Sequence, residues 1–261
     1  QYEDRLKEYL AHDPQQAIAY AEEYMQFGGY PQVILADNAA EKQHILNEIY
    51  QSYLIRDISF LLGVEKTDAF TNLVRVLASS VGNLVAVSEL AGTLGISVPT
   101  VKQYLWYLEK TYITQRVQPF FRNARTEISK MPVFYFFDLG LRNFASEQGK
   151  VQMASGGFVF ENFVYLQLQE QAQSFSPIHF WRTKSGAEVD FVIDGPGYPM
   201  AFEIKYSSFR TPVVGKSLHS FIKRYTPPHV YIVTKDYAHE MKVDSTTIHF
   251  VPFYALLIFF K

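Results

Sequence analysis

Cysteine is absent from the sequence, and this absence removes several kinds of chemistry at once. A chain without thiols forms no disulfide, no thiolate zinc site and no cysteine nucleophile, which fits a reducing cytoplasm. The sequence also lacks an apolar run long enough to span a bilayer, so we expect no membrane segment. It contains no G-x-x-x-x-G-K-[ST] motif, so we expect no ATP binding through a P-loop.

A large excess of basic side chains, typical of dedicated nucleic-acid binders, is missing as well. The net charge is −2 over 261 residues. This balance hides an asymmetry, because residues 1–77 carry 6 basic and 12 acidic side chains, whereas residues 78–136 carry 6 and 3. Any basic footprint for nucleic acid must therefore be local, and it begins in the middle of the chain.

Apolar and aromatic residues, in contrast, are abundant. They make up 48% and 16% of the sequence, enough for a sizeable core, which excludes wholesale disorder. The seven histidines are scattered without the spacing of metal ligands, so core or surface roles are expected for them. The chain starts with Gln1 and has neither an initiator Met nor a signal peptide, so we expect a piece of a longer protein.

Residues 1–77 are expected to form a helical segment without chemistry of its own. Asp13-Pro14 is a good helix start, and Gly28-Gly29 a stop. A single helix is expected from about Asn38 to Gly63, and another from about 68 to 81.

Residues 78–150 have the pattern of a winged helix domain. Two short helices, from Val87 and from Val98, are separated by Gly95, and two strands with a tip at 122–125 follow. Trp106, Leu105 and Leu108 are expected in the core. The residues expected to contact DNA are Thr100, Lys102 and Gln103 for base edges, and Arg122, Arg125 and Lys130 for phosphates. The alternative is that this segment only packs against its neighbours, and winged helices also serve to bind proteins.

Residues 151–261 alternate helices and strands. Their expected order, α-β-β-β-α-β, predicts a mixed sheet flanked by helices, and the whole chain is expected to be α+β. A helix from Phe158 to Gln171 contains Glu161, and strands are expected at 178–181, 188–193, 200–206 and 229–233.

Two of these strands bring acidic side chains together. Strand alternation places Glu203 and Lys205 on one face. If the preceding hairpin closes with Ile193 opposite Met200, Asp190 faces Glu203, with Cβ atoms about 4.5–5.5 Å apart. Carboxylates so close repel one another unless a cation lies between them.

We therefore expect a divalent cation, Mg²⁺ or Mn²⁺, on Asp190 and Glu203, with Glu161 as a further ligand. Such a cation polarises a phosphodiester and acidifies a water, and Lys205 would orient that water or offset charge on the phosphate. The alternative is structural: Glu188 and Lys205 form an ordinary cross-strand ion pair, and Asp190 is only solvated.

Glu161, Asp190 and Glu203-Ile204-Lys205 in this order resemble the PD-(D/E)XK nuclease superfamily. Nearly the whole chain also resembles the C-terminal half of a family of bacterial and archaeal AAA-type ATPases. That resemblance rests on Gly28-Gly29-Tyr30-Pro31, Tyr53-Leu54-Ile55-Arg56-Asp57, Thr100–Leu105, Phe136–Leu141 and Trp181–Asp190.

The resemblance implies a cytoplasmic protein with a P-loop ATPase domain before this chain, and ATP is expected only there. DNA and the ATPase domain are the implied partners, and self-association stays open. The implied site is Glu161, Asp190, Glu203 and Lys205. The resemblance also leaves open a nuclease-like fold without activity that binds DNA or protein.

Overall fold

The structure is a computed structural model that describes residues 13–58, 60, 63–120, 131–146, 157–172, 177–195 and 198–259. The chain forms two compact units. One comprises Glu22–Arg116 and Met131–Asn162 and is called the helical unit below. The other comprises Gln1–Ala21, Val117–Lys130 and Phe163–Lys261 and is called the sheet unit. The class is mixed αβ, in agreement with the expected α+β chain.

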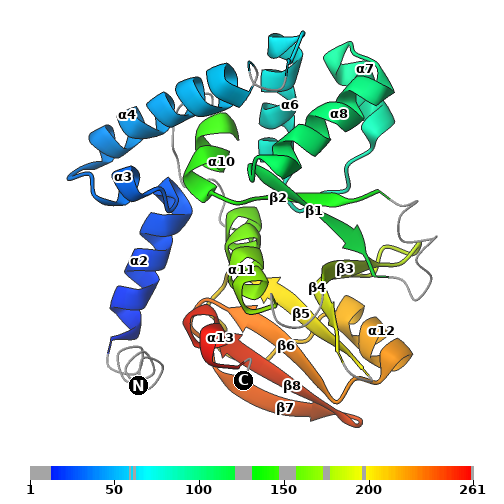
Figure 1. Ribbon diagram of the computed structural model, residues 1–261. Helices are drawn as coiled ribbons and strands as arrows, with labels where there is room; N and C mark the ends of the chain where they lie inside the picture. The colour runs from blue at the N-terminus through cyan, green and yellow to red at the C-terminus, as the bar shows by residue number, and fades with distance from the viewer. Residues whose placement is uncertain are drawn as a thin grey trace. The chain divides into compact units, whose positions relative to one another are not determined.

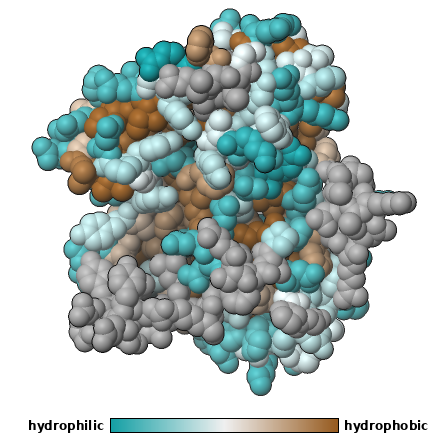
Figure 2. Space-filling view, in the orientation of Figure 1, coloured by the Kyte–Doolittle hydropathy of each residue, from teal (hydrophilic) through white to brown (hydrophobic). Residues whose placement is uncertain are grey.

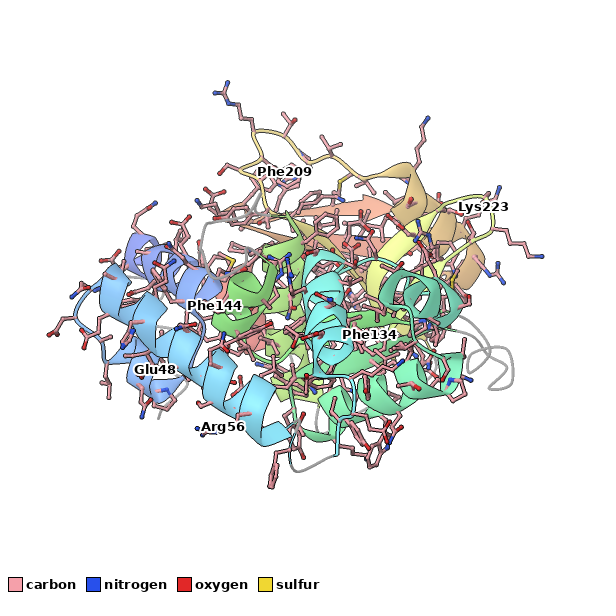
Figure 3. All side chains as sticks on the ribbon, turned by 90° about the horizontal axis from the view of Figure 1, so that it is seen from above. Glu48, Arg56, Phe134, Phe144, Phe209 and Lys223 are labelled. Atoms are coloured by element: carbon pink, nitrogen blue, oxygen red, sulfur yellow. The ribbon has the colours of Figure 1, made fainter. Side chains whose placement is uncertain are left out.

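The helical unit is built mainly from helices (Figure 1). Its elements are α2 (Pro14–Phe27), α3 (Pro31–Ile34), α4 (Ala39–Ile49), η1 (Tyr50–Ile58), α6 (Thr67–Ser79), α7 (Val87–Leu94), α8 (Val98–Lys110), β1 (Thr114–Pro119), β2 (Val133–Phe136), α10 (Leu139–Ser146) and the start of α11 (Gly157–Ala172). The boundary between the units falls within α2, β1 and α11. Phe134 and Phe144, labelled in Figure 3, are buried in this unit.

Helix starts and stops follow local side-chain chemistry. Asn38 accepts the Glu41 backbone N–H at 3.0 Å and caps α4. Ser97 accepts the Thr100 N–H at 3.2 Å and caps α8, whose Pro99 is tolerated in the first turn. Gly95 ends α7 with φ +63°, a conformation that costs glycine little.

Two expectations about this unit were wrong. The single helix expected from Asn38 to Gly63 is α-helical only to Ile49, and residues 50–58 wind as the π-helix η1. The spacing of the apolar residues in the sequence does not distinguish an α-helix from a π-helix over this short segment. Trp106, expected in the core, is 50% exposed, whereas Leu105 and Leu108 are buried as expected.

Other large apolar side chains are also exposed. Ile34 and Leu35 at the end of α3 are the clearest pair, and Figure 2 shows hydrophobic surface over α3 and α4. No helix among the described residues is long and apolar enough to cross a bilayer.

The sheet unit contains α11, then β3 (Ile178–Arg182), β4 (Glu188–Asp194), β5 (Pro199–Lys205), α12 (Lys216–Tyr225), β6 (His229–Thr234), β7 (His239–Val243), β8 (Thr246–Pro252) and α13 (Phe253–Phe259). Within this unit the strand order is β1-β3-β4-β5-β6-β8-β7. The pairs β3–β4 and β4–β5 are antiparallel, and β5–β6 and β6–β8 are parallel. The expected order α-β-β-β-α-β is confirmed, with strand ends within two residues of those expected. The β7–β8 hairpin was not foreseen.

Helix α12 covers β4 with a core that includes Leu218, Phe221 and Trp181. On β5, Ala201 belongs to this core, so by alternation Glu203 and Lys205 share its face. Phe202 points to the other face and stacks on Tyr231 of β6, with ring centroids 5.0 Å apart.

The helical unit is held together by the buried carboxylate of Asp138. One oxygen accepts the Gly29 N–H at 2.7 Å and the other accepts the Leu141 N–H at 2.8 Å. Burial raises the pKa of Asp138, and the N–H groups of Gly29, Leu141 and Gly140 act in the opposite direction. The carboxylate thus ties the end of α2 to the start of α10.

Gly140 is the closest point of that contact, and it yields a stability prediction. A Cβ there would lie 2.0 Å from the Phe27 carbonyl oxygen, so Gly140→Ala should destabilise the protein by about 1–3 kcal/mol. Gly92→Ala, inside α7 with open space around it, should instead be neutral or stabilise by about 0.5–1 kcal/mol. Chemical denaturation of both variants tests the packing. Equal effects at the two sites would contradict it.

Candidate functional site

Glu203 and Lys205 are placed by the middle of the sheet. Strand β5 is paired on both sides, with Glu203 opposite Ile232 and Lys205 opposite Thr234 of β6. The facing residue of β6, Ile232, is buried, and Glu203 is itself only 8% exposed. The two side chains alternate with buried Phe202 and Ile204, as expected from the sequence.

The two oxygens of the Glu203 carboxylate have different surroundings. Oε1 lies 2.7 Å from the Lys205 ammonium nitrogen, whose side chain is 47% exposed. Oε2 is buried and has no hydrogen-bond partner among the described residues. A buried acceptor without a partner is costly, so a donor or a cation at Oε2 would stabilise this arrangement.

Asp190 lies at a β-bulge in β4. His179 pairs with Val192 and Trp181 pairs with Val189, so Phe180 alone is opposite both Asp190 and Phe191. Val189 and Val192, three residues apart, belong to the same core cluster, which strict alternation would not allow. A bulge re-aims the side chain that it carries. The bulge was not predicted from the sequence, because the pattern of β4 contains neither a glycine nor a break that would mark it.

The bulge turns the Asp190 carboxylate onto the backbone of β5. Its Oδ2 accepts the Ile204 N–H at 2.7 Å, between Glu203 and Lys205 in sequence. The expected hairpin register is confirmed, since Ile193 pairs with Met200. The backbone pairing between β4 and β5 ends at Phe191 and Phe202, however, so Asp190 contacts β5 through its side chain.

Glu188 does not form the ion pair with Lys205 that the sequence left open. Its carboxylate lies 3.2 Å from Arg182 of β3, and both side chains are about half exposed. The closest cation to Glu203 is therefore Lys205, two residues along the same strand.

Glu161 belongs to the helical unit, at the start of α11. The Tyr135 hydroxyl donates to its Oε1 at 2.6 Å, and the carboxylate lies close to Gly82. In the ranges that the structure describes, no group of three or more His, Asp or Glu side chains is placed to hold a metal ion. The role of Glu161 as a third ligand stays a prediction.

The residues expected to contact DNA are divided by what the structure describes. Lys102 and Gln103 are exposed on α8, as is the unexpected Trp106, while Thr100 is half-buried near Ser97. Arg122, Arg125 and Lys130 lie outside the described residues. The amide of Gln103 donates to the Tyr107 hydroxyl at 2.5 Å, so it would have to leave that contact to reach a base.

Two families match the chain, and together they cover most of it. Residues 18–152 match the Domain of unknown function (DUF8612), and residues 156–256 match the Domain of unknown function (DUF4143).

Curated relatives are uncharacterised. A Haemophilus influenzae protein is 29% identical over 157 residues, which cover 58% of this chain and 38% of that protein. A Mycobacterium tuberculosis protein is 28% identical over 203 residues, covering 74% and 44%. A Methanocaldococcus jannaschii protein is 26% identical over 194 residues, covering 72% and 42%. The chain thus spans less than half the length of the curated relatives it matches.

The contact between Glu203 and Lys205 predicts a coupled effect on stability. Lys205→Met should destabilise the protein by about 1–3 kcal/mol, because the buried Glu203 carboxylate loses its cation. The loss is smaller than for a fully buried pair, because Lys205 is half exposed and solvent screens its charge. Adding Glu203→Gln should restore most of it. Arg182→Met, at the exposed pair with Glu188, should change stability by at most about 0.5 kcal/mol. Urea unfolding of the four proteins measures this, and equal losses for Lys205→Met and Arg182→Met would contradict it.

Proposed function

We propose that this chain, which belongs to the family described as Domain of unknown function (DUF8612), is a DNA-binding, nuclease-like module. In this proposal it hydrolyses phosphodiesters with the help of a divalent cation. The observation that carries this proposal is the Glu203 carboxylate, with one buried oxygen that lacks a partner and the other on Lys205. A buried carboxylate of this kind suits a metal ligand better than a structural ion pair.

The order of elements in the sheet unit supports this proposal. Helix α11 precedes the antiparallel strands β3, β4 and β5, and β6 joins β5 in parallel after α12. The PD-(D/E)XK superfamily, which the sequence resembles, has this order. The acidic residue of β4 and the Glu-x-Lys of β5 occupy the matching strands.

Asp190 and Glu203 fit an Mg²⁺ or Mn²⁺ ion, because both are carboxylates and one oxygen of Glu203 is available. When bound, the cation would supply Lewis-acid polarisation of the phosphate and a more acidic water. Glu161, expected from the sequence as a further ligand, belongs to the helical unit, and its part in the site stays a prediction. The bulge at Asp190 fixes its carboxylate on the β5 backbone, which limits the motion of one ligand.

Lys205 has two roles in this proposal. Without the cation its ammonium group offsets the charge of Glu203. With substrate bound, the half-exposed side chain swings toward the phosphate, where it holds the attacking water or offsets charge on the phosphoryl oxygens.

The segment from α7 to β2 is proposed to bind DNA as a winged helix. Two helices joined at Gly95 are followed by strands β1 and β2, and α8 presents Lys102, Gln103 and Trp106 to solvent. Arg122, Arg125 and Lys130 would add phosphate contacts. The partner ATPase domain belongs to the same proposal and rests on the resemblance. The cytoplasmic location rests on the absence of cysteine, and self-association stays open.

A second function, binding without catalysis, is favoured by one observation. The Lys205 ammonium group already lies 2.7 Å from Glu203, so a cation in the chain itself reduces the need for a metal. A domain of this kind would hold DNA or protein on the same scaffold.

Metal-dependent melting of Asp190→Asn separates the two functions. The Asn side chain keeps an oxygen for the Ile204 N–H and removes a negative charge, so in chelator the variant should melt no lower than wild type. Only wild type should gain stability from excess Mg²⁺, because ligands that bind the folded state stabilise it. Asp194→Asn, at the exposed end of the same strand, should respond like wild type.

Cleavage of linear and supercoiled DNA with Mn²⁺ completes this test. Wild type should cut, and Asp190→Asn and Lys205→Met should lose at least about a hundredfold in rate, as expected when a charge-stabilising group is removed. A wild type that neither cuts nor responds to metal, with a less stable Asp190→Asn, would leave the binding function.

A separate prediction concerns the DNA contacts. The triple change Lys102→Ala, Arg122→Ala and Arg125→Ala should weaken duplex binding and reduce the slope of log K against log salt by about one unit per lost phosphate contact. Lys242→Ala, on the exposed strand β7, should leave the slope unchanged. Fluorescence anisotropy over a salt series measures both. An unchanged slope in the triple variant would exclude these contacts.

A further inference from the structure

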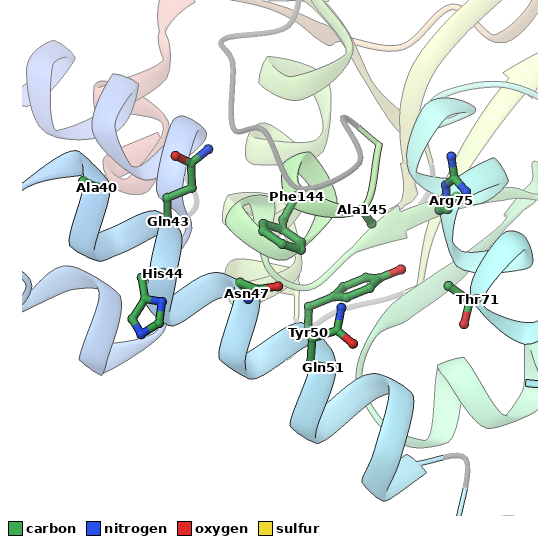
Figure 4. Close-up of a pocket in the computed structure, with 10 residues that line it drawn as sticks. All are labelled: Ala40, Gln43, His44, Asn47, Tyr50, Gln51, Thr71, Arg75, Phe144 and Ala145. Atoms are coloured by element: carbon green, nitrogen blue, oxygen red, sulfur yellow. The ribbon is translucent and has the colours of Figure 1, made fainter. Parts of the chain in front are cut away.

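A hollow of about 520 Å³ opens within the helical unit, far in sequence from the residues of the proposed nuclease-like site (Figure 4). Three helical segments and α10 line it. The lining residues are Ala40, Gln43, His44 and Asn47 of α4, Tyr50 and Gln51 of η1, Thr71 and Arg75 of α6, and Phe144 and Ala145 of α10. This volume lies in the range of small-molecule sites, about 300–1,000 Å³.

The polar lining is suited to an anion. No Asp or Glu is among these lining residues, although residues 1–77 are acidic. Arg75 forms no ion pair with any residue in the described ranges, and the one hydrogen bond of its guanidinium group there, to Asn72, is long at 3.4 Å. Glu48 of α4 (Figure 3) lies 3.5 Å from His44 and is two-thirds exposed. The guanidinium group therefore keeps most of its donors for a ligand.

The other side of the hollow is aromatic. The rings of Tyr50 and Phe144 lie 5.3 Å apart at 49°, and Figure 4 shows Tyr50 reaching from η1 toward α6 beneath Phe144. Burial raises the pKa of the Tyr50 hydroxyl, with Arg75 acting in the opposite direction, so the group stays protonated and can donate. The π-helix begins at this residue, and π-helical turns often occur at functional sites.

A second hollow of about 460 Å³ shares Arg75 and extends the same chemistry. Its other lining residues are Asn72, Val76, Ser79, Ser80, Thr93, Leu94 and Ser146. Hydroxyl groups predominate, and again no carboxylate contributes. The Ser79 and Ser146 hydroxyl groups donate to backbone carbonyl oxygens, so Arg75, which lines both hollows, is the main donor of the two.

We infer that this hollow binds a phosphorylated small molecule of mononucleotide size, with the phosphate on Arg75 and the planar ring on the apolar wall of Tyr50, Phe144 and Ala145. Arg75 supplies charged donors to the phosphate, while Asn47 and Gln51 supply amides for the polar edge of the ring. The Thr71 hydroxyl donates to the Thr67 carbonyl oxygen at 2.9 Å and would have to leave that contact to add a neutral donor. This inference does not rest on the nuclease-like site, whose residues Asp190, Glu203 and Lys205 lie in the sheet unit.

Titration calorimetry with AMP tests it on the whole chain. AMP should bind with one-to-one stoichiometry, at least about tenfold more tightly than either inorganic phosphate or adenosine, because both halves of the ligand contribute. Arg75→Gln should weaken AMP binding at least about tenfold, in line with the loss of a charge-assisted contact. Tyr50→Phe, which removes only the hydroxyl, should weaken it less. Arg210→Gln, an exposed arginine of the sheet unit, and Asp190→Asn should leave it unchanged.

Several results would overturn the inference. They are no heat of binding with AMP up to about 5 mM, a range that still detects weak sites, or equal affinity in wild type and Arg75→Gln. Phosphate binding as tight as AMP would remove the role of the aromatic wall. Circular dichroism melts of each variant establish that it is folded, and Arg75→Lys, which keeps the charge, should bind AMP between wild type and Arg75→Gln.

Discussion

A carboxylate held in the sheet interior beside one ammonium group is the constraint on which the chemistry of the sheet unit depends. Glu203 is only 8% exposed and lies opposite buried Ile232 of β6. Lys205 offsets its charge through Oε1, yet Oε2 keeps an unmet demand for a donor or cation. Apolar side chains of similar volume often stabilise a fold as well as a buried ion pair does, so stability alone gives no account of this pair. The bulge in β4 brings a second carboxylate, that of Asp190, onto the backbone of the same strand.

The helical unit depends on a different buried acid. Asp138 is surrounded by backbone N–H groups, which satisfy its oxygens without a cation. Gly28, Gly29 and Gly140 allow the close approach, since a Cβ at Gly28 would meet the Asp138 carboxylate and one at Gly140 would meet backbone. Two acidic side chains of similar burial thus differ in how their oxygens are satisfied. Asp138 is fully satisfied and structural, whereas Glu203 is incompletely satisfied and open to a ligand.

The sequence predicted the parts of the fold that depend on local chemistry. The helix start near Asn38, the break at Gly95 between two short helices and the hairpin register at Ile193 are confirmed, because each depends on neighbours close in sequence. The π-helix, the bulge and the exposure of Trp106 were missed. Each of these depends on how distant segments pack, and none changes the apolar period that the sequence displays. For the candidate site, the sequence proposed the residues, whose role stays a prediction, and the structure shows the surroundings of the Glu203 oxygens.

The two candidate sites differ in how the fold selects the sign of their ligand. In the sheet unit, the Asp190 carboxylate of β4 accepts a backbone N–H of β5 and Lys205 contacts one oxygen of Glu203, and the proposed ligand there is a cation. In the helical unit, the acidic side chains of α4 are exposed, and the Glu48 carboxylate lies beside the His44 ring. Arg75 is left among amides and hydroxyls, which leaves a preference for an anion. Net charge would not reveal either preference, since residues 1–77 are acidic overall but surround the anion-suited hollow. What decides is which charges find partners within the fold, because a paired charge contributes little field and an unpaired one in a low-dielectric hollow contributes much.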